Sequence, residues 1–137
     1  MTKIIAAIFF IFLYSESAMA KDCSSIQAEA AENAVDTLDS WPSIFSAYKR
    51  YKHCDDAAIA EGFTDKVVHL LATQWGSLHQ VQQLVAQDAS FQLFIVKHIN
   101  ASADASELDR IRFSAMRECP ALASLLCKQI AGAASER

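Results

Sequence analysis

Apolar residues recur along the chain at the three- and four-residue spacing of amphipathic helices, and no stretch alternates as a strand does. The pattern predicts a first helix from Ser24 to Leu38. A break from Asp39 to Pro42 separates it from a second helix, and Pro42 suits the first turn of that helix, where a missing N–H costs little. The start of the mature region therefore predicts two short helices.

The third predicted helix carries the longest apolar stripe. Asp55 or Asp56 can cap it, and it runs to about Trp75. Gly62 lies inside this helix, where it is expected to bend or split it, and Gly76 is expected to end it. The stripe consists of Ile59, Phe63, Val67, Leu70 and Leu71.

Further helices are predicted after Gly76. Ser77 opens one, Asp88 caps the next, Asp104 and Glu107 form a capping pattern before another, and Cys119-Pro120 separates that helix from the last. Their apolar faces are predicted to lie in the core: Leu78, Val81, Leu84 and Val85; Phe91, Phe94, Ile95 and Ile99; Leu108, Ile111, Ala115 and Met116; Leu122, Leu125, Leu126 and Ile130. The whole pattern predicts an all-α fold, a compact bundle of about six to seven short helices.

The first twenty residues have the pattern of a secretory signal peptide. Lys3 gives a positive start, an uncharged apolar run covers residues 4–14, and Ala18 and Ala20 supply small residues before a cleavage point. The run is shorter than the roughly 20 apolar residues of a membrane span. We predict a cleaved leader over residues 1–20 and one helical domain over residues 21–137. The mature protein is expected to be periplasmic or secreted, with no stable membrane anchor.

All four cysteines, Cys23, Cys54, Cys119 and Cys127, follow the predicted leader. An even number in an exported chain favours disulfides, and four cysteines permit three pairings. We favour Cys23–Cys54 and Cys119–Cys127. In one straight helix an offset of eight residues spans about 12 Å, beyond the reach of a disulfide. The second pair therefore requires a turn after Pro120.

Charge narrows the choice of partner. The formal net charge is −4, and the basic stretch from Lys49 to Lys52 is followed at once by Asp55 and Asp56. An acidic chain without a basic cluster argues against nucleic acid as a partner. No cofactor motif, glycine-rich phosphate loop or nucleophile motif is present in the sequence.

The densest group of polar residues surrounds the start of the third predicted helix. Its candidate binding residues are His53, Asp55, Asp56, Glu61 and Asp65. Adjacent ligands at a helix start seldom converge on one ion, so we predict no metal site here. On a continuous helix Asp56 and Glu61 lie about 140° apart, so acid–base catalysis by this pair would require a break near Gly62. Otherwise the two aspartates cap the helix and the other carboxylates form an exposed edge.

Three segments resemble a group of small exported proteins of Gram-negative bacteria. They are Tyr51-Lys52-His53-Cys54-Asp55-Asp56 continuing to Ile59-Ala60-Glu61-Gly62-Phe63, the run from Phe94 to Ile99, and the Cys119-Pro120 … Leu126-Cys127 ending. The likeness covers most of residues 42–130, and members of the group often carry glycine at the position of Ala57. It implies export and attaches no activity or catalytic residue.

We therefore expect an exported protein that binds another periplasmic protein, such as an inhibitor or immunity protein acting on an enzyme or toxin. Trp41 is either a core residue or an exposed anchor of that interface. Two alternatives remain open: a small periplasmic hydrolase that uses the acidic residues near the third helix, and a metal-binding or envelope-stress protein.

Overall fold

The computed structural model describes residues 22–136, so the predicted signal peptide at residues 1–20 lies outside the described residues. The all-helical prediction is confirmed for the described part, which contains no strand. Its seven α-helices are α1 (Ser25–Val35), α2 (Trp41–Tyr51), α3 (Ala57–Thr73), α4 (Leu78–Gln87), α5 (Ser90–Lys97), α6 (Ala105–Arg117) and α7 (Ser124–Ala133). Two short 3-10 helices, η1 (Lys52–Cys54) and η2 (Trp75–Ser77), flank α3. None of the described helices is long and apolar enough to cross a bilayer.

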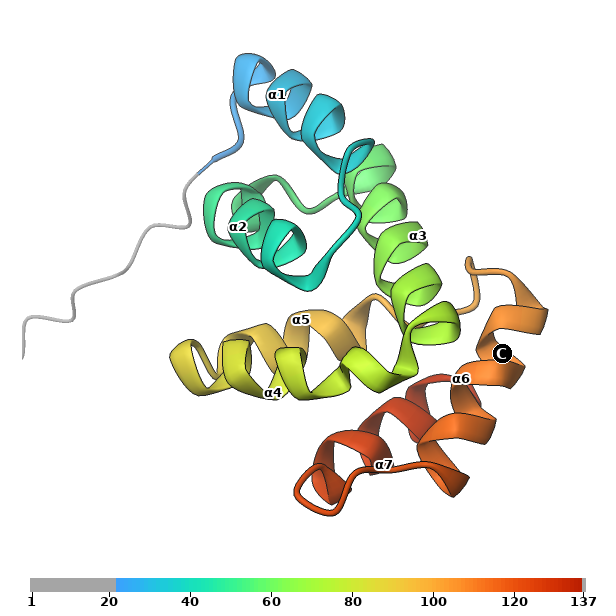
Figure 1. Cartoon of the computed structure of the whole chain (residues 1–137). Helices are drawn as coiled ribbons and strands as arrows, with labels where there is room; N and C mark the ends of the chain where they lie inside the picture. The colour runs from blue at the N-terminus through green and yellow to red at the C-terminus, as the bar shows by residue number, and fades with distance from the viewer. Residues whose placement is uncertain (1–21, 137) are drawn as a thin grey trace, which may run out of the picture.

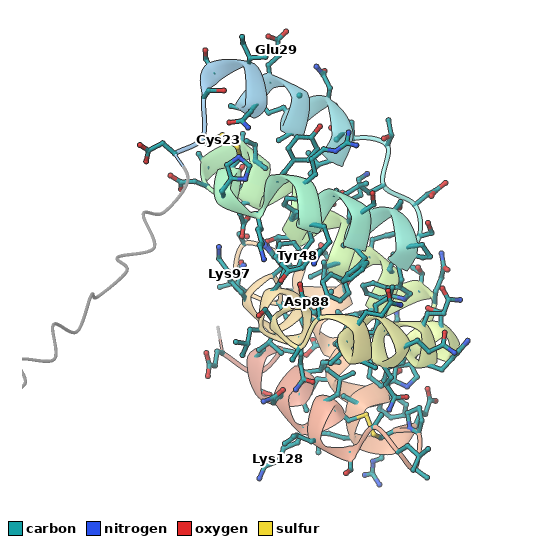
Figure 2. The ribbon with its side chains drawn as sticks, turned by 90° about the vertical axis from the view of Figure 1, so that its left-hand side faces the viewer. Cys23, Glu29, Tyr48, Asp88, Lys97 and Lys128 are labelled. Atoms are coloured by element: carbon teal, nitrogen blue, oxygen red, sulfur yellow. A yellow bond between two sulfur atoms is a disulfide. The ribbon has the colours of Figure 1, made fainter. Side chains whose placement is uncertain are left out.

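The helices form a stack in which α3 joins the two ends (Figure 1). Helix α3 packs against α1 and α2 at one end and against α6 at the other. Helices α4 and α5 pair in the middle, where α4 contacts α2 and α5 contacts α7. The stack places Glu29 of α1 and Lys128 of α7 at opposite ends of the molecule (Figure 2).

One continuous core runs through the stack. Trp41, Phe63, Phe91, Ile95 and Ile111 are among its fully buried side chains. Of the two predictions for Trp41, the core position is therefore correct. Its indole Nε1 donates a hydrogen bond to Ser77 Oγ at 2.7 Å, which satisfies the one polar group of the buried ring.

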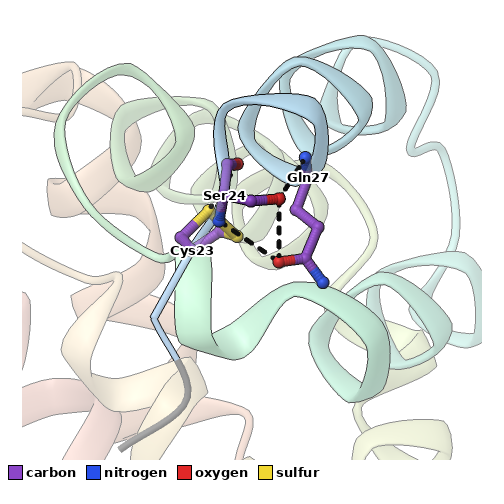
Figure 3. The surroundings of a disulfide bond; sticks show 4 residues. Cys23, Ser24 and Gln27 are labelled. Atoms are coloured by element: carbon purple, nitrogen blue, oxygen red, sulfur yellow. Dashed lines mark hydrogen bonds between the residues drawn. A yellow bond between two sulfur atoms is a disulfide. The ribbon is translucent and has the colours of Figure 1, made fainter.

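Both favoured disulfides are present. Cys23–Cys54 joins the residue before the α1 cap to η1, with the Cα atoms 5.0 Å apart. Next to it, Ser24 and Gln27 form a reciprocal capping box at the start of α1 (Figure 3). Cys119–Cys127 closes the connection between α6 and α7, and the chain turns after Pro120 as that pairing requires.

Helix α3 corrects two expectations about glycine. It is continuous through Gly62, so the helix is not split there. Gly62 serves packing instead, because a Cβ at this position would lie 2.8 Å from Val35 Cγ2 on α1. The helix ends at Thr73 with Gln74 as its C-cap, and Gly76 lies in η2 rather than ending α3.

The caps predicted from aspartates are largely present. Asp56 is the N-cap of α3, and its side chain accepts a hydrogen bond from the Ala57 amide. Asp104 accepts bonds from the amides of Ser106 and Glu107 at the start of α6. The pKa of Asp104 lies below its ordinary value of 3.8, first because of the hydrogen bond from the Ser106 hydroxyl and then because of the bonds from the two amides.

Candidate functional site

A buried polar cluster links three segments near the middle of the stack. Asp55 Oδ2 accepts from Lys97 Nζ at 2.6 Å and lies 3.2 Å from His98 Nε2. On the other side of the imidazole ring, His98 Nδ1 lies 3.0 Å from Thr64 Oγ1. Asn100 Nδ2 donates to the same hydroxyl at 3.3 Å. The cluster of Asp55, Thr64, Lys97, His98 and Asn100 therefore ties the chain after η1 to α3 and to the end of α5.

The hydrogen bonds of this cluster can be ordered as one chain of donors and acceptors that runs from Asn100 through Thr64 and His98 to Asp55. Because Asn100 donates to Thr64 Oγ1, the hydroxyl can give its own proton to His98 Nδ1. The imidazole then carries its hydrogen on Nε2 and donates it to Asp55. We assign His98 this tautomer, which satisfies both ring nitrogens of a side chain that is only 1% exposed.

The Asp55 carboxylate is held in its charged form although its side chain is only 6% exposed. Burial raises its pKa, but the hydrogen bonds from His98 and Lys97, with the charge of Lys97, outweigh that effect. The pKa of Asp55 consequently lies below the ordinary value of 3.8. The Nζ of Lys97 belongs to a largely exposed side chain, so one side of the ion pair faces solvent.

The order hydroxyl, imidazole, carboxylate matches the order of groups in a nucleophilic triad. Thr64 is only 4% exposed, however, and its hydroxyl is enclosed between His98 and Asn100. A substrate carbonyl therefore has no approach to Thr64 Oγ1 in this conformation. The geometry serves to connect helices rather than to attack a substrate.

Two buried atoms beside the cluster have no hydrogen-bond partner, Asp55 Oδ1 and His53 Nε2. Both belong to the segment that the Cys23–Cys54 disulfide holds against α1. In the described part of the chain no three His, Cys, Asp or Glu side chains come close enough to hold a metal ion.

The structure separates the residues predicted to form one binding site. Trp41 lies in the core, and Asp55 is turned inward to His98 and Lys97. Asp56 is an exposed helix cap, and His53 is half-buried. Of the predicted set, Glu61 and Asp65 remain on an exposed edge of α3.

Asp65 also borders a hollow of about 320 Å³ between α3 and the end of α1. Asp36, Asp39, Lys66 and His69 line the same hollow. His69 Nδ1 lies 3.3 Å from Glu107 Oε1, which gives this side chain a partner on α6. The acidic character that the sequence indicated is therefore found on α1 and α3, away from Asp55.

The sequence-based prediction is wrong for several apolar residues of α6 and α7. Met116, Leu122 and Leu125 were expected in the core but are exposed, and Leu122 keeps 92% of its surface. Phe113, one turn before Arg117, is exposed as well. At roughly 100° per residue, Phe113 points about 140° away from the buried Leu108, on the opposite side of α6. We refer to Phe113, Met116, Leu122 and Leu125 as the exposed apolar face.

A groove of about 480 Å³ lies where the end of α6 meets α7 beside this face. Its wall consists mostly of small side chains, and Lys128 is its one charged lining residue in the described part of the chain. The residues that line it are Ala115, Met116, Cys119, Ser124, Cys127, Lys128, Ala131, Gly132 and Ser135. Met116 also borders a neighbouring hollow with Asp109, Arg112, Phe113 and Arg117, so Phe113 and Met116 adjoin the groove. Leu122 and Leu125 line a separate hollow against α4 and α5.

Comparison with known proteins adds no assignment: no family model, curated protein or solved structure matches this chain.

Proposed function

We propose that this chain is an exported binding protein without catalytic activity, of the kind that inhibits or neutralises an enzyme or toxin in the periplasm. The leader pattern at residues 1–20 supports export. The two disulfides, Cys23–Cys54 and Cys119–Cys127, are consistent with an oxidising compartment.

The observation that carries the proposal is where the exposed apolar side chains gather. Six large apolar residues are exposed in the described part of the chain, and four of them lie between residues 113 and 125. Phe113 and Met116 adjoin the groove, and Leu122 and Leu125 line the hollow against α4 and α5. Single exposed apolar residues are ordinary, but a gathered group marks a contact surface. Phenylalanine, methionine and arginine are also enriched at protein interfaces, and Phe113, Met116 and Arg117 lie together here.

The hydrolase alternative depended on a break at Gly62 that would turn Asp56 and Glu61 toward one substrate. Because α3 is continuous, no break turns the two carboxylates toward each other: Asp56 is the N-cap before the helix, and Glu61 lies on its exposed edge. In the remaining ionisable cluster, His98 is buried and both of its ring nitrogens are engaged by Thr64 and Asp55. The binding function is therefore the better supported of the two.

The test starts from the exported chain carrying a C-terminal tag, captured from periplasm of the source cells. Co-purified proteins are identified by mass spectrometry, produced separately and mixed with the chain in calorimetry. The proposal expects a stoichiometric complex that suppresses the partner's enzymatic or toxic activity. It would be contradicted by a chain that forms no complex with any purified candidate. It would equally be contradicted by turnover of a substrate that Asp56→Ala and Glu61→Ala abolish without changing the Tm.

A further inference from the structure

We propose that the groove between α6 and α7 binds an amphipathic α-helix of the partner protein, with carboxylates on that helix facing Lys128 and Arg117. This inference rests on the proposed binding function and specifies its surface and the chemistry of its partner. Three features of the described residues support it: the shape of the groove, an unexplained glycine and the charge around the rim.

The shape of the groove fits a helix. The α7 residues that line it run from Ser124 to Gly132, a step of eight residues that covers about 12 Å, or about two turns, and Ser135 lies just beyond the end of the helix. Small residues on the wall, such as Ala115 and Ala131, allow a second helix axis to come close. Met116 stands at the rim as a flexible apolar contact of the sort that accepts varied helix faces.

Gly132 has no explanation within the chain itself. It lies in the last turn of α7, where glycine is less favourable to helix than alanine. A Cβ at Gly132 would meet no described atom within 4 Å, in contrast to Gly62, where the space is filled by Val35. Glycine is suited to positions that another backbone approaches closely. Here that backbone belongs to a partner lying over α7.

The charges around the surface favour a negatively charged helix. Lys128 lines the groove, and Arg117 lines the adjoining hollow, where Arg112 already pairs with Asp109 at 3.4 Å. A symmetric dimer through this surface would bring the same cations of two copies together, which is unfavourable. An anionic membrane is disfavoured because the whole chain carries a net charge of −4. A partner helix with aspartates or glutamates beside its apolar face satisfies both conditions.

The surface is also held in place before any partner arrives. The Cys119–Cys127 disulfide closes the connection between the two helices. Gln82 Nε2 on α4 donates to the Leu122 carbonyl oxygen at 2.9 Å and fixes the tip of that connection. A preorganised surface loses less conformational entropy on binding, so the exposed position of Leu122 favours association.

The experiment places a photoreactive phenylalanine at Ser124 in the groove or, as the control, at Glu29 on α1 at the opposite end (Figure 2). Both versions of the full exported chain are irradiated in intact cells, and the linked peptide is sequenced by mass spectrometry. The groove position is expected to link to an amphipathic helical segment with acidic flanks. Linkage to a second copy, to lipid, or to a strand or basic segment would overturn the proposal.

The control separates this proposal from the more general one. Linkage of a partner protein from Glu29 but not from Ser124 would leave the binding function standing and refute the groove. If neither position links to a protein, both proposals fail.

Two matched variants sharpen the result with the purified partner. Gly132→Gln places a side chain over the groove and is expected to weaken binding at least about tenfold, whereas Gly132→Ala adds only a Cβ and is expected to weaken binding by a smaller factor. Both variants should unfold at or above the urea concentration of the parent, since the space is open and glycine disfavours helix. Lys128→Glu should weaken binding by about tenfold as well, with recovery when an acidic residue of the partner helix is changed to lysine. Unchanged affinity in Gly132→Gln and Lys128→Glu would overturn the assignment.

Discussion

Globular proteins usually bury apolar side chains and expose polar ones, and two regions of this molecule do the reverse. The buried polar cluster places polar groups inside, and the α6–α7 surface places apolar groups outside. In the cluster, a carboxylate, an imidazole and a hydroxyl lie inside the fold. On α6 and α7, Phe113, Met116 and their neighbours lie outside it. Within the cluster, nearly all of the hydrogen-bonding groups find their partners in one another, across three segments of the chain. The exposed apolar face has no such internal explanation, which is why we assign it to a partner.

The two disulfides allow the two regions to be compared by the same change. Removing a disulfide lowers the free energy of unfolding by an amount that grows with the loop it closes. The expected loss is about 4 kcal/mol for Cys23–Cys54, which are 31 residues apart, and about 2.5 kcal/mol for Cys119–Cys127, which are 8 residues apart. Each pair is replaced by alanines, and the free energy of unfolding is measured in urea. We expect the region of the buried polar cluster to depend more on its disulfide than the α6–α7 surface does. A larger loss of unfolding free energy on removing Cys119–Cys127 than on removing Cys23–Cys54 would contradict this.

Removal of the Asp55 carboxylate tests whether the cluster holds the fold together. Asp55→Ala leaves buried His98 Nε2 without an acceptor, and we expect a loss of about 3 kcal/mol. Asp65→Ala is the matched control, since its carboxylate is exposed and should change stability by less than about 0.5 kcal/mol. Equal effects of the two substitutions in urea unfolding would show that the cluster contributes little.

Stability should also depend on pH through the same carboxylate. The folded-state pKa of Asp55 lies below the ordinary 3.8, so the folded state favours the charged form. Its contribution is therefore present above the unfolded-state pKa and is lost as the pH falls through the folded-state pKa. The difference in unfolding free energy between the parent and Asp55→Asn should be constant near neutral pH and shrink in acid. A difference that grows on acidification would refute this.

Ala57 offers a smaller effect beside the cluster. It has φ of 46°, in the left-handed region that an L side chain enters only with strain. Ala57→Gly should raise the free energy of unfolding by about 1 kcal/mol. Ala58→Gly, one residue further into α3, is the control and should lower stability instead.

The sequence allowed the helices, the caps and the disulfide pairing to be predicted because each depends on nearby residues. Asp104 predicts the start of α6 because a capping residue bonds to amides only two or three positions further on. The Cys119–Cys127 pair required only a turn after Pro120. The cluster was not predicted, because Asp55 and His98 are 43 residues apart and only the packing of α5 brings them together. A spacing signal existed for His98, which follows Phe91, Phe94 and Ile95 on one helical face.

The exposed face was missed for a different reason. Met116 and Leu125 were grouped with the apolar residues around them, although each lies about 100° around its helix from the buried residue next to it, Ala115 or Leu126. Hydrophobicity alone thus predicted burial where the helical geometry pointed outward. The sequence therefore placed the candidate site on the acidic residues of α3. Only the three-dimensional structure separated those residues and showed which apolar side chains of α6 and α7 are exposed.

The most direct test of the account measures the urea unfolding of Phe113→Ser combined with Met116→Ser, together with the affinity of the same variant for the partner. If the exposed apolar face serves a partner, stability stays within about 0.5 kcal/mol of the parent while binding is lost. A loss of several kcal/mol in stability, or binding at the parental affinity, would contradict it.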